Sequence, residues 1–88
     1  MEKQSVTITN PTGIHARPAS LLVSLCQQFQ SDIVMECADS GRQVNPKSIF
    51  SVLSGRLKPG TTVTVAADGE DAQQAVQEIC TFIEALEE

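Results

Sequence analysis

The chain has one histidine, three cysteines and no Cys-x-x-Cys pair among its 88 residues. A zinc site needs several cysteine and histidine ligands at close spacing, and a disulfide framework needs an even number of cysteines. Cys26, Cys37 and Cys80 meet neither requirement. Cys26 and Cys80 also fall on apolar helical stripes, where free cysteine packs as a small hydrophobic side chain. We therefore expect reduced, buried cysteines and no metal or other cofactor.

The sequence is also short of basic residues and of long apolar runs. Six lysines and arginines against eleven acids give a net charge of −5, which argues against nucleic acid as a partner. No apolar run approaches the roughly 18 residues that a membrane-spanning helix needs. The polar start, residues 1–4, is not a secretory signal. We expect a single domain over residues 1–88, located in the cytoplasm and without membrane insertion.

The charges are unevenly distributed along the chain. No acid occurs in residues 3–31 or 40–67, which hold all six basic residues, whereas residues 68–88 hold seven acids and no base. If several of the basic residues share a face, that face would attract an acidic partner surface or a phosphate group. The alternative is a set of scattered, solvated charges. The candidates for the shared face are Arg17, Lys47, Arg56 and Lys58.

Hydrophobic spacing predicts seven elements in the order β-α-β-β-α-β-α. Alternating residues predict strands at 5–9, 33–37, 42–44 and 61–66, with the second and third forming a hairpin. This order fits an α+β fold in which helices cover one face of a four-stranded antiparallel sheet. We expect the threonines at positions 7, 9, 62 and 64 on the wetter face.

Three helices are expected between and after these strands. The first covers residues 16–28, with Pro18 in its first turn, where the missing N–H costs nothing. The second is short, with Ser48 as its N-cap and Gly55 as its stop. The third carries an apolar stripe over residues 72–86, and its first turn should contain acids that suit the helix dipole. Those acids are Glu70 and Asp71.

His15 stands at or beside the N-cap of the first helix. A helix start presents unpaired backbone N–H groups and the positive end of a dipole, which suits an anion. Imidazole is partly or mostly neutral at cytoplasmic pH and can act as a nucleophile. Arg17 offers a guanidinium that can bind two phosphate oxygens. This combination favours a histidine that carries a phosphoryl group, and the alternative is an ordinary cap histidine beside a solvated arginine.

The stretch Gly13-Ile14-His15-Ala16-Arg17-Pro18-Ala19 resembles HPr, the histidine-containing phosphocarrier family of the bacterial sugar phosphotransferase system. Weaker similarities follow in the right order along nearly the whole chain. The resemblance implies an open-faced β-sandwich and a stoichiometric carrier rather than an enzyme. His15 would accept a phosphoryl group on its Nδ1 (pros) nitrogen from phosphorylated enzyme I and pass it to enzyme IIA proteins of sugar permeases. Arg17 would stabilise the phosphate.

The same resemblance implies regulation and docking. Ser48 matches the serine that HPr kinase/phosphorylase phosphorylates in many members, a signal that reaches a transcriptional regulator; a plain N-cap is the alternative. A phosphate there would lie at a helix N-terminus, where negative charge is tolerated. We expect a monomer that docks its partners through the first two helices. The candidate docking residues are Ala16, Ser20, Ile49, Phe50, Leu53 and Arg56.

Two departures from the family pattern lie near the predicted site. Gly55-Arg56 stands where the family usually has leucine then glycine, and Ser51 replaces a glycine common in members with serine regulation. Three other functions stay open. The chain could be a carrier of the nitrogen-related branch, a regulatory module that acts through phosphorylated Ser48, or a small acyl-phosphate hydrolase that uses Asn10.

Overall fold

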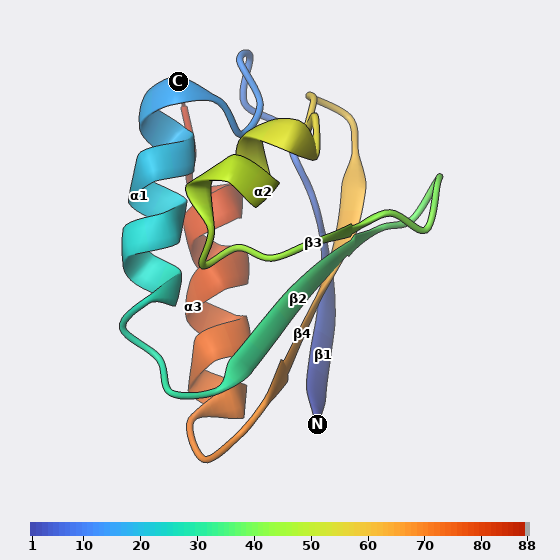
Figure 1. Ribbon diagram of the computed structural model, residues 1–88. Coiled ribbons are helices and arrows are strands. Elements are labelled where there is room, and N and C mark those ends of the chain that lie inside the picture. The colour runs from blue at the N-terminus through green and yellow to red at the C-terminus, as the bar shows by residue number, and fades with distance from the viewer. Residues whose placement is uncertain (88) are drawn as a thin grey trace.

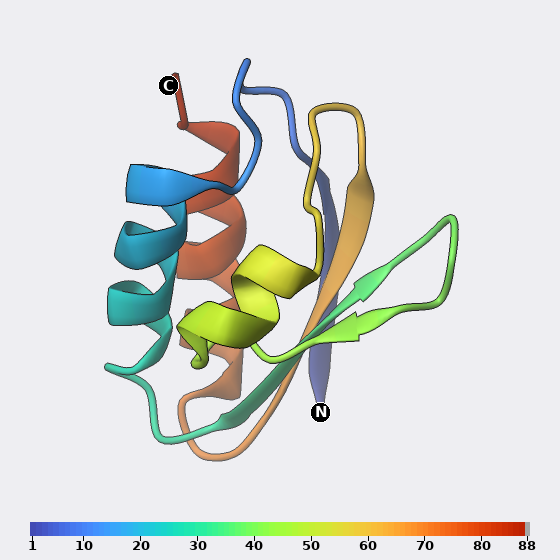
Figure 2. The ribbon, with the colours of Figure 1, turned by 45° about the horizontal axis from the view of Figure 1, so that its top comes forward.

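The computed structural model describes residues 1–87 and contains seven elements in the predicted order. The strands pair antiparallel in the order β1-β4-β2-β3. The three helices lie on one face of this sheet and leave the other face open (Figures 1 and 2). The predicted fold class is therefore confirmed. The elements are β1 (Glu2–Thr7), α1 (Ala16–Cys26), β2 (Asp32–Cys37), β3 (Gln43–Val44), α2 (Ile49–Ser54), β4 (Thr62–Asp68) and α3 (Ala72–Glu84).

The core lies between the sheet and the two longer helices. Strand alternation sends Val63 and Val65 of β4 to the helical side, where both are fully buried. On the open side, the hydroxyls of Thr7 and Thr62, which are partners in the register of β1 and β4, bond at 2.9 Å. Thr7, Thr62 and Thr64 therefore lie on the wetter face, as predicted, whereas Thr9 lies beyond the end of β1. No helix within residues 1–87 has the length and apolar content needed to cross a bilayer.

All three cysteines are free and buried, as predicted. Burial raises the pKa of Cys26 to about 12 and that of Cys80 to about 11. Because the thiolate is the reactive form of cysteine, neither side chain is a nucleophile at neutral pH. Both pack as small apolar residues, Cys26 in α1 and Cys80 in α3.

Several predicted boundaries are wrong, including that of β4, which spans residues 62–68 instead of 61–66. β1 spans residues 2–7 instead of 5–9, because this edge strand pairs with β4 from Glu2 onward and its polar side chains hide the alternation. α1 ends at Cys26, two residues early, and Phe29 then turns back into the core. α3 spans residues 72–84, so the two preceding acids are not in its first turn.

Asp71 ties α3 to the segment that follows α1. It occupies the N-cap position of α3 but makes no cap hydrogen bond. Its carboxylate instead accepts the backbone N–H groups of Gln30 (2.8 Å) and Ser31 (2.9 Å) and the Ser31 hydroxyl. The approach is close, since a Cβ added to Gly69 would stand 2.7 Å from Ser31 Cα. This polar junction fixes the end of α1 that lies away from His15.

Asp71 makes the junction dependent on pH. Hydrogen bonds, first from the Ser31 hydroxyl and then from the Gln30 N–H, lower the pKa of the Asp71 carboxyl. Such a group stabilises the fold fully above its ordinary pKa, and this contribution is lost as the pH falls through the lower folded-state pKa. We expect Asp71→Asn to lower the Tm at neutral pH, with a difference from the unmodified protein that shrinks below about pH 4.

Calorimetry of both proteins from about pH 7 to about pH 3 measures this difference. Glu70→Gln is the matched control, because Glu70 is exposed and precedes Asp71 by one residue. A Tm difference for Asp71→Asn that stays constant over the whole range would contradict the assignment.

Candidate functional site

The loop between β1 and α1 is fixed by a second loop from the other half of the chain. The N–H of Ile8 donates to Thr61 O (2.8 Å), and the N–H of Gly60 donates to Ile8 O (2.6 Å). Further along, the N–H of Ile14 donates to Leu57 O (2.8 Å). The Ile14 and Leu57 side chains are both buried. The backbone immediately before His15 is therefore held in place by residues 57–61.

Asn10 and Gly13 shape the tip of this loop. Asn10 is buried, and its Nδ2 donates to Gly13 O at 2.8 Å. Gly13 has a φ of +68°, which favours glycine, and a Cβ there would collide with the carbonyl oxygen of Leu57. Asn10 thus has a structural role in the loop. This role does not match the catalytic asparagine that an acyl-phosphate hydrolase would need.

His15 is the N-cap residue of α1, as predicted, with an extended backbone (φ −145°, ψ 157°) and an exposed side chain. The side chain makes no capping hydrogen bond, so the interpretation as an ordinary cap fails. As the N-cap residue, His15 adjoins the first-turn N–H groups, which have no intrahelical acceptor. The positive end of a helix at this position suits an anion.

Ala16 departs from helical geometry between His15 and Arg17. Its φ is 49°, a left-handed conformation that costs about 1–2 kcal/mol for a residue with a Cβ. In a regular helix, residues i and i+2 point in different directions. Because Ala16 interrupts the helical geometry between them, the directions expected for residues i and i+2 of a helix do not apply to His15 and Arg17. Nothing in the sequence indicated this conformation, since alanine has no preference for it.

The backbone brings three of the four candidates for the basic face near His15. Arg17 follows the histidine by two residues, and Arg56 and Lys58 flank Leu57, whose carbonyl holds the residue before the histidine. Lys47 does not belong to this group. Its ammonium donates to the backbone oxygens of residues 29 (2.9 Å) and 31 (2.8 Å), beyond the far end of α1. The 11 residues of α1 separate these two places by about 16 Å.

The predicted docking residues lie on or directly after α1 and α2, which pack against each other. Phe50 is 80% exposed and Leu53 is 43% exposed, whereas Ile49 is half-buried against the core. Leu21 of α1 is also 45% exposed and was not predicted. In the sequence, Leu21 lies outside the set of α1 residues that face the core, and this position could have identified it. The other predicted docking residues are also exposed: Ala16, Ser20 and Arg56.

Ser48 is the N-cap of α2, as predicted. Its Oγ accepts the N–H of Ser51 at 3.4 Å, and the hydroxyl of Ser51 in turn accepts the N–H of Asn45 at 2.8 Å. The serine that replaces the family glycine therefore joins the start of α2 to the preceding loop. The Ser48 side chain is half-buried at this turn.

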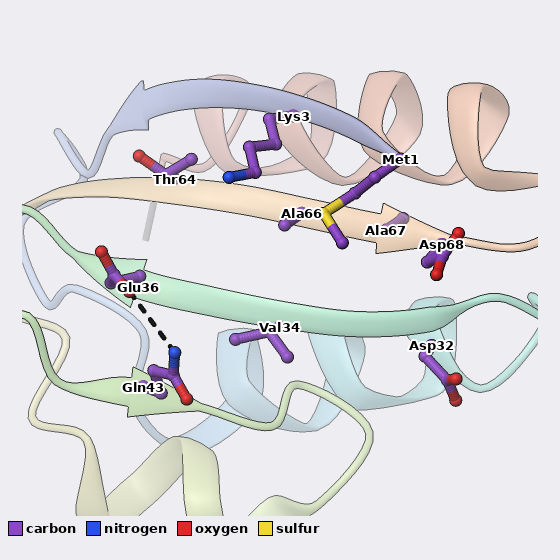
Figure 3. Close-up of a pocket in the computed structure, with 10 residues that line it drawn as sticks. All are labelled: Met1, Lys3, Asp32, Val34, Glu36, Gln43, Thr64, Ala66, Ala67 and Asp68. Carbon is purple, nitrogen blue, oxygen red and sulfur yellow. Dashed lines mark hydrogen bonds between the residues drawn. The ribbon is translucent and has the colours of Figure 1, made fainter.

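The open face of the sheet bears a hollow of about 520 Å³, which Figure 3 shows in close-up. Its lining includes Lys3, Val34 and Ala66, and Gln43 donates to Glu36 at 3.4 Å along one side. None of its lining residues belongs to the His15 loop. Small-molecule substrates are usually enclosed in concave pockets, whereas His15 lies at an exposed helix end. Within residues 1–87, no three His, Cys, Asp or Glu side chains group to hold a metal ion.

Comparisons with known proteins agree with this arrangement. A family model described as "PTS HPr component phosphorylation site" matches residues 2–85. The HPr-like protein Crh of Bacillus subtilis is 38% identical over 84 residues, which cover 96% of each chain. Phosphocarrier protein HPr of Mycoplasma capricolum is 44% identical over 79 residues, which cover 90% of this chain and 86% of the relative.

The fold is similar as well. The crystal structure of HPr-C-His from Thermoanaerobacter tengcongensis aligns with a TM-score of 0.90 at 35% identity, covering 97% of this chain and 93% of that chain. Sequence and fold thus match over nearly the whole length, and the chain belongs to the HPr family of phosphocarriers of the phosphotransferase system.

Proposed function

We propose that the protein, as a monomer, accepts a phosphoryl group on Nδ1 of His15 from phosphorylated enzyme I and passes it to enzyme IIA proteins. One observation carries the proposal: the only histidine is exposed at the N-terminus of α1, and its side chain is not used as a cap. In the first transfer, the imidazole attacks phosphorus and the bond to the donor breaks. In the second, the nitrogen–phosphorus bond breaks as the acceptor attacks, so the carrier is regenerated.

The start of α1 helps the first transfer. Its positive end favours the negatively charged phosphoryl group on the ring by about 0.3–1 kcal/mol at an exposed site. Arg17 adds a guanidinium that can bind phosphate oxygens in a bidentate manner. The bond stays labile because the site stabilises the group without enclosing it.

The exposed surface on α1 and α2 is the proposed docking site. Leu21, Phe50 and Leu53 are large apolar side chains that a monomeric protein would otherwise bury. Exposed aromatic residues of this kind commonly contribute most to a protein interface. The neighbouring cations would steer an acidic partner surface toward His15.

Mass spectrometry after incubation with phosphoenolpyruvate and enzyme I tests the proposal. We expect a mass gain of one phosphate that maps to His15 and is lost in acid. Omission of phosphoenolpyruvate is the control. The absence of any gain on His15, with enzyme I shown to be active on another carrier, would contradict the proposal. Repeating the reaction with enzyme I of the nitrogen-related branch distinguishes the two kinds of carrier by their rates.

A second candidate is a regulatory module that acts through phosphorylated Ser48. The 38% identity to Crh favours it, because a solved structure of Crh is described as "Catabolite Repression HPr". An acid-stable phosphate on Ser48 after treatment with ATP and HPr kinase, without transfer to His15, would support this second function. The exposed His15 favours the carrier.

Arg17→Ala should slow phosphoryl transfer in both directions while leaving His15 able to react. Loss of a charge-assisted hydrogen bond to phosphate corresponds to a decrease of about 10- to 100-fold. Rapid-quench kinetics with enzyme I, forward and reverse, measure the change. Lys3→Ala is the control, since it removes one positive charge from the open sheet face. Equal rates for Arg17→Ala and the unmodified protein would show that this guanidinium does not reach the phosphate.

A further inference from the structure

Two residues with a Cβ adopt a left-handed backbone, Ala16 (φ 49°) and Arg56 (φ 52°). They lie on either side of one backbone contact, the hydrogen bond from the Ile14 N–H to Leu57 O. Ala16 follows Ile14 by two residues, and Arg56 directly precedes Leu57. Strained backbone is retained mainly where function needs it. Both strained residues of this kind in the described chain therefore flank the His15 loop.

The glycine after α2 does not occupy the left-handed position. Gly55 is the C-cap of α2 with an ordinary helical φ of −71°, so it is not glycine for conformational reasons. Position 55 needs a glycine because the space there is too small for a side chain: a Cβ would stand 2.6 Å from Cγ2 of Val44. The left-handed conformation falls on the next residue, where a second glycine would relieve the strain. The chain has an arginine there instead.

The Arg56 side chain is exposed and makes no hydrogen bond or ion pair with any of residues 1–87. Arg42, in contrast, donates to Gly55 O at 3.4 Å, and Lys47 binds two backbone oxygens. No acid occurs in residues 40–67 to neutralise Arg56 locally. The guanidinium of Arg56 can therefore form all of its hydrogen bonds with an anion.

We propose that Arg56 binds the phosphoryl group carried on His15, together with Arg17. The inference rests on the proposed function, because it assumes that His15 is the residue phosphorylated. The two guanidiniums come from different segments, so they can bind different phosphate oxygens. Arg56 approaches from the loop whose backbone already holds Ile14, next to the histidine. Its role is distinct from partner docking, since it acts on the isolated phosphorylated carrier.

The test uses the phosphorylated protein without any partner. Phosphoramidate phosphorylates His15 chemically: the nitrogen–phosphorus bond of the reagent breaks, the imidazole nitrogen–phosphorus bond forms, and ammonia leaves. Phosphorus NMR then follows the second ionisation of the phosphoryl group with pH. A cation in contact with the phosphate favours the dianion and lowers its pKa, so removal of the cation raises that pKa. A failed transfer from enzyme I would contradict the proposed function without affecting this measurement.

We expect Arg56→Gln to raise the pKa of the phosphoryl group by about half a pH unit, and Arg56→Lys to restore most of the shift. Arg56→Gly should raise the phosphoryl pKa as much as Arg56→Gln does, while raising the Tm of the protein by relieving the left-handed strain. The two variants thus separate contact with phosphate from backbone effects. Lys3→Gln, which removes a positive charge from the open sheet face, should leave the phosphoryl pKa unchanged.

An unchanged phosphoryl pKa in Arg56→Gln would overturn the proposal. So would equal shifts in Arg56→Gln and Lys3→Gln, because the effect would then reflect net charge alone. Failure of phosphoramidate to label His15 would also overturn it, since no phosphoryl group would be present at the site.

Discussion

His15→Ala is expected to abolish phosphoryl acceptance completely and to leave the fold intact. The side chain is exposed, makes no capping hydrogen bond and is the only imidazole in the chain. Surface substitutions of this kind usually change the free energy of unfolding by less than about 0.5 kcal/mol. Loss of the nucleophile, in contrast, removes the atom to which phosphorus bonds. Mass spectrometry after incubation with phosphoenolpyruvate and enzyme I measures acceptance, and urea denaturation measures stability.

Ser24→Ala is the matched control, because Ser24 is exposed on the same helix and is not among the predicted docking residues. It should accept phosphate like the unmodified protein. Uptake of an acid-labile phosphate by His15→Ala would show that the reactive nitrogen has been assigned to the wrong residue. His15→Gln, with a longer polar side chain, checks that the loss does not depend on truncation to alanine.

Gly13→Ala is expected to destabilise the protein by about 2–5 kcal/mol. One part of this cost, about 1–2 kcal/mol, comes from placing a Cβ at a φ of +68°. The other part, about 1–3 kcal/mol, comes from collision with the carbonyl oxygen of Leu57, which must move and weaken its bond from Ile14. Phosphoryl transfer should slow as well, because the backbone before His15 is displaced. Urea denaturation and rapid-quench kinetics measure the two effects.

Gly41 provides a control with almost the same backbone. Its φ is +72°, and a Cβ there would have nothing within 4 Å. Gly41→Ala should therefore show only the conformational cost and normal phosphoryl transfer, and its difference from Gly13→Ala isolates the collision. Equal losses of stability in the two variants would mean that the Leu57 loop moves aside freely and does not fix the site.

The order of the elements and the place of His15 could be predicted because both depend on local signals. Strand alternation, helical spacing and Pro18 in the first turn are all encoded within a few residues. The contacts of Lys47 and Asp71 could not be predicted, because each reaches a segment at least 16 residues away. Because of these long-range hydrogen bonds, Lys47 does not join the predicted basic face, and Asp71 bonds to residues 30 and 31 instead of lying in the first turn of α3.

The missed features at the site have a related cause. Ala16 is left-handed although alanine favours the right-handed helix, so tertiary structure imposes its conformation. The resemblance to HPr pointed to Arg56 as a departure, but only the backbone showed that Arg56 occupies the left-handed position and that Gly55 is needed for space. Propensity describes the backbone conformation that a residue prefers on its own, whereas Ala16 and Arg56 adopt the conformation that the neighbouring loop requires.

The bond between Ile14 and Leu57 also bears on how the protein matures. A nascent chain that has emerged from the ribosome only through α1 already carries its histidine but lacks the segment that positions it. The same holds for a fragment cut between β2 and α2. Under the proposed function, competence to carry phosphate is thus a property of the finished chain, and a pool of incomplete or degraded carriers would draw little of the cell's phosphoryl flux away from intact ones.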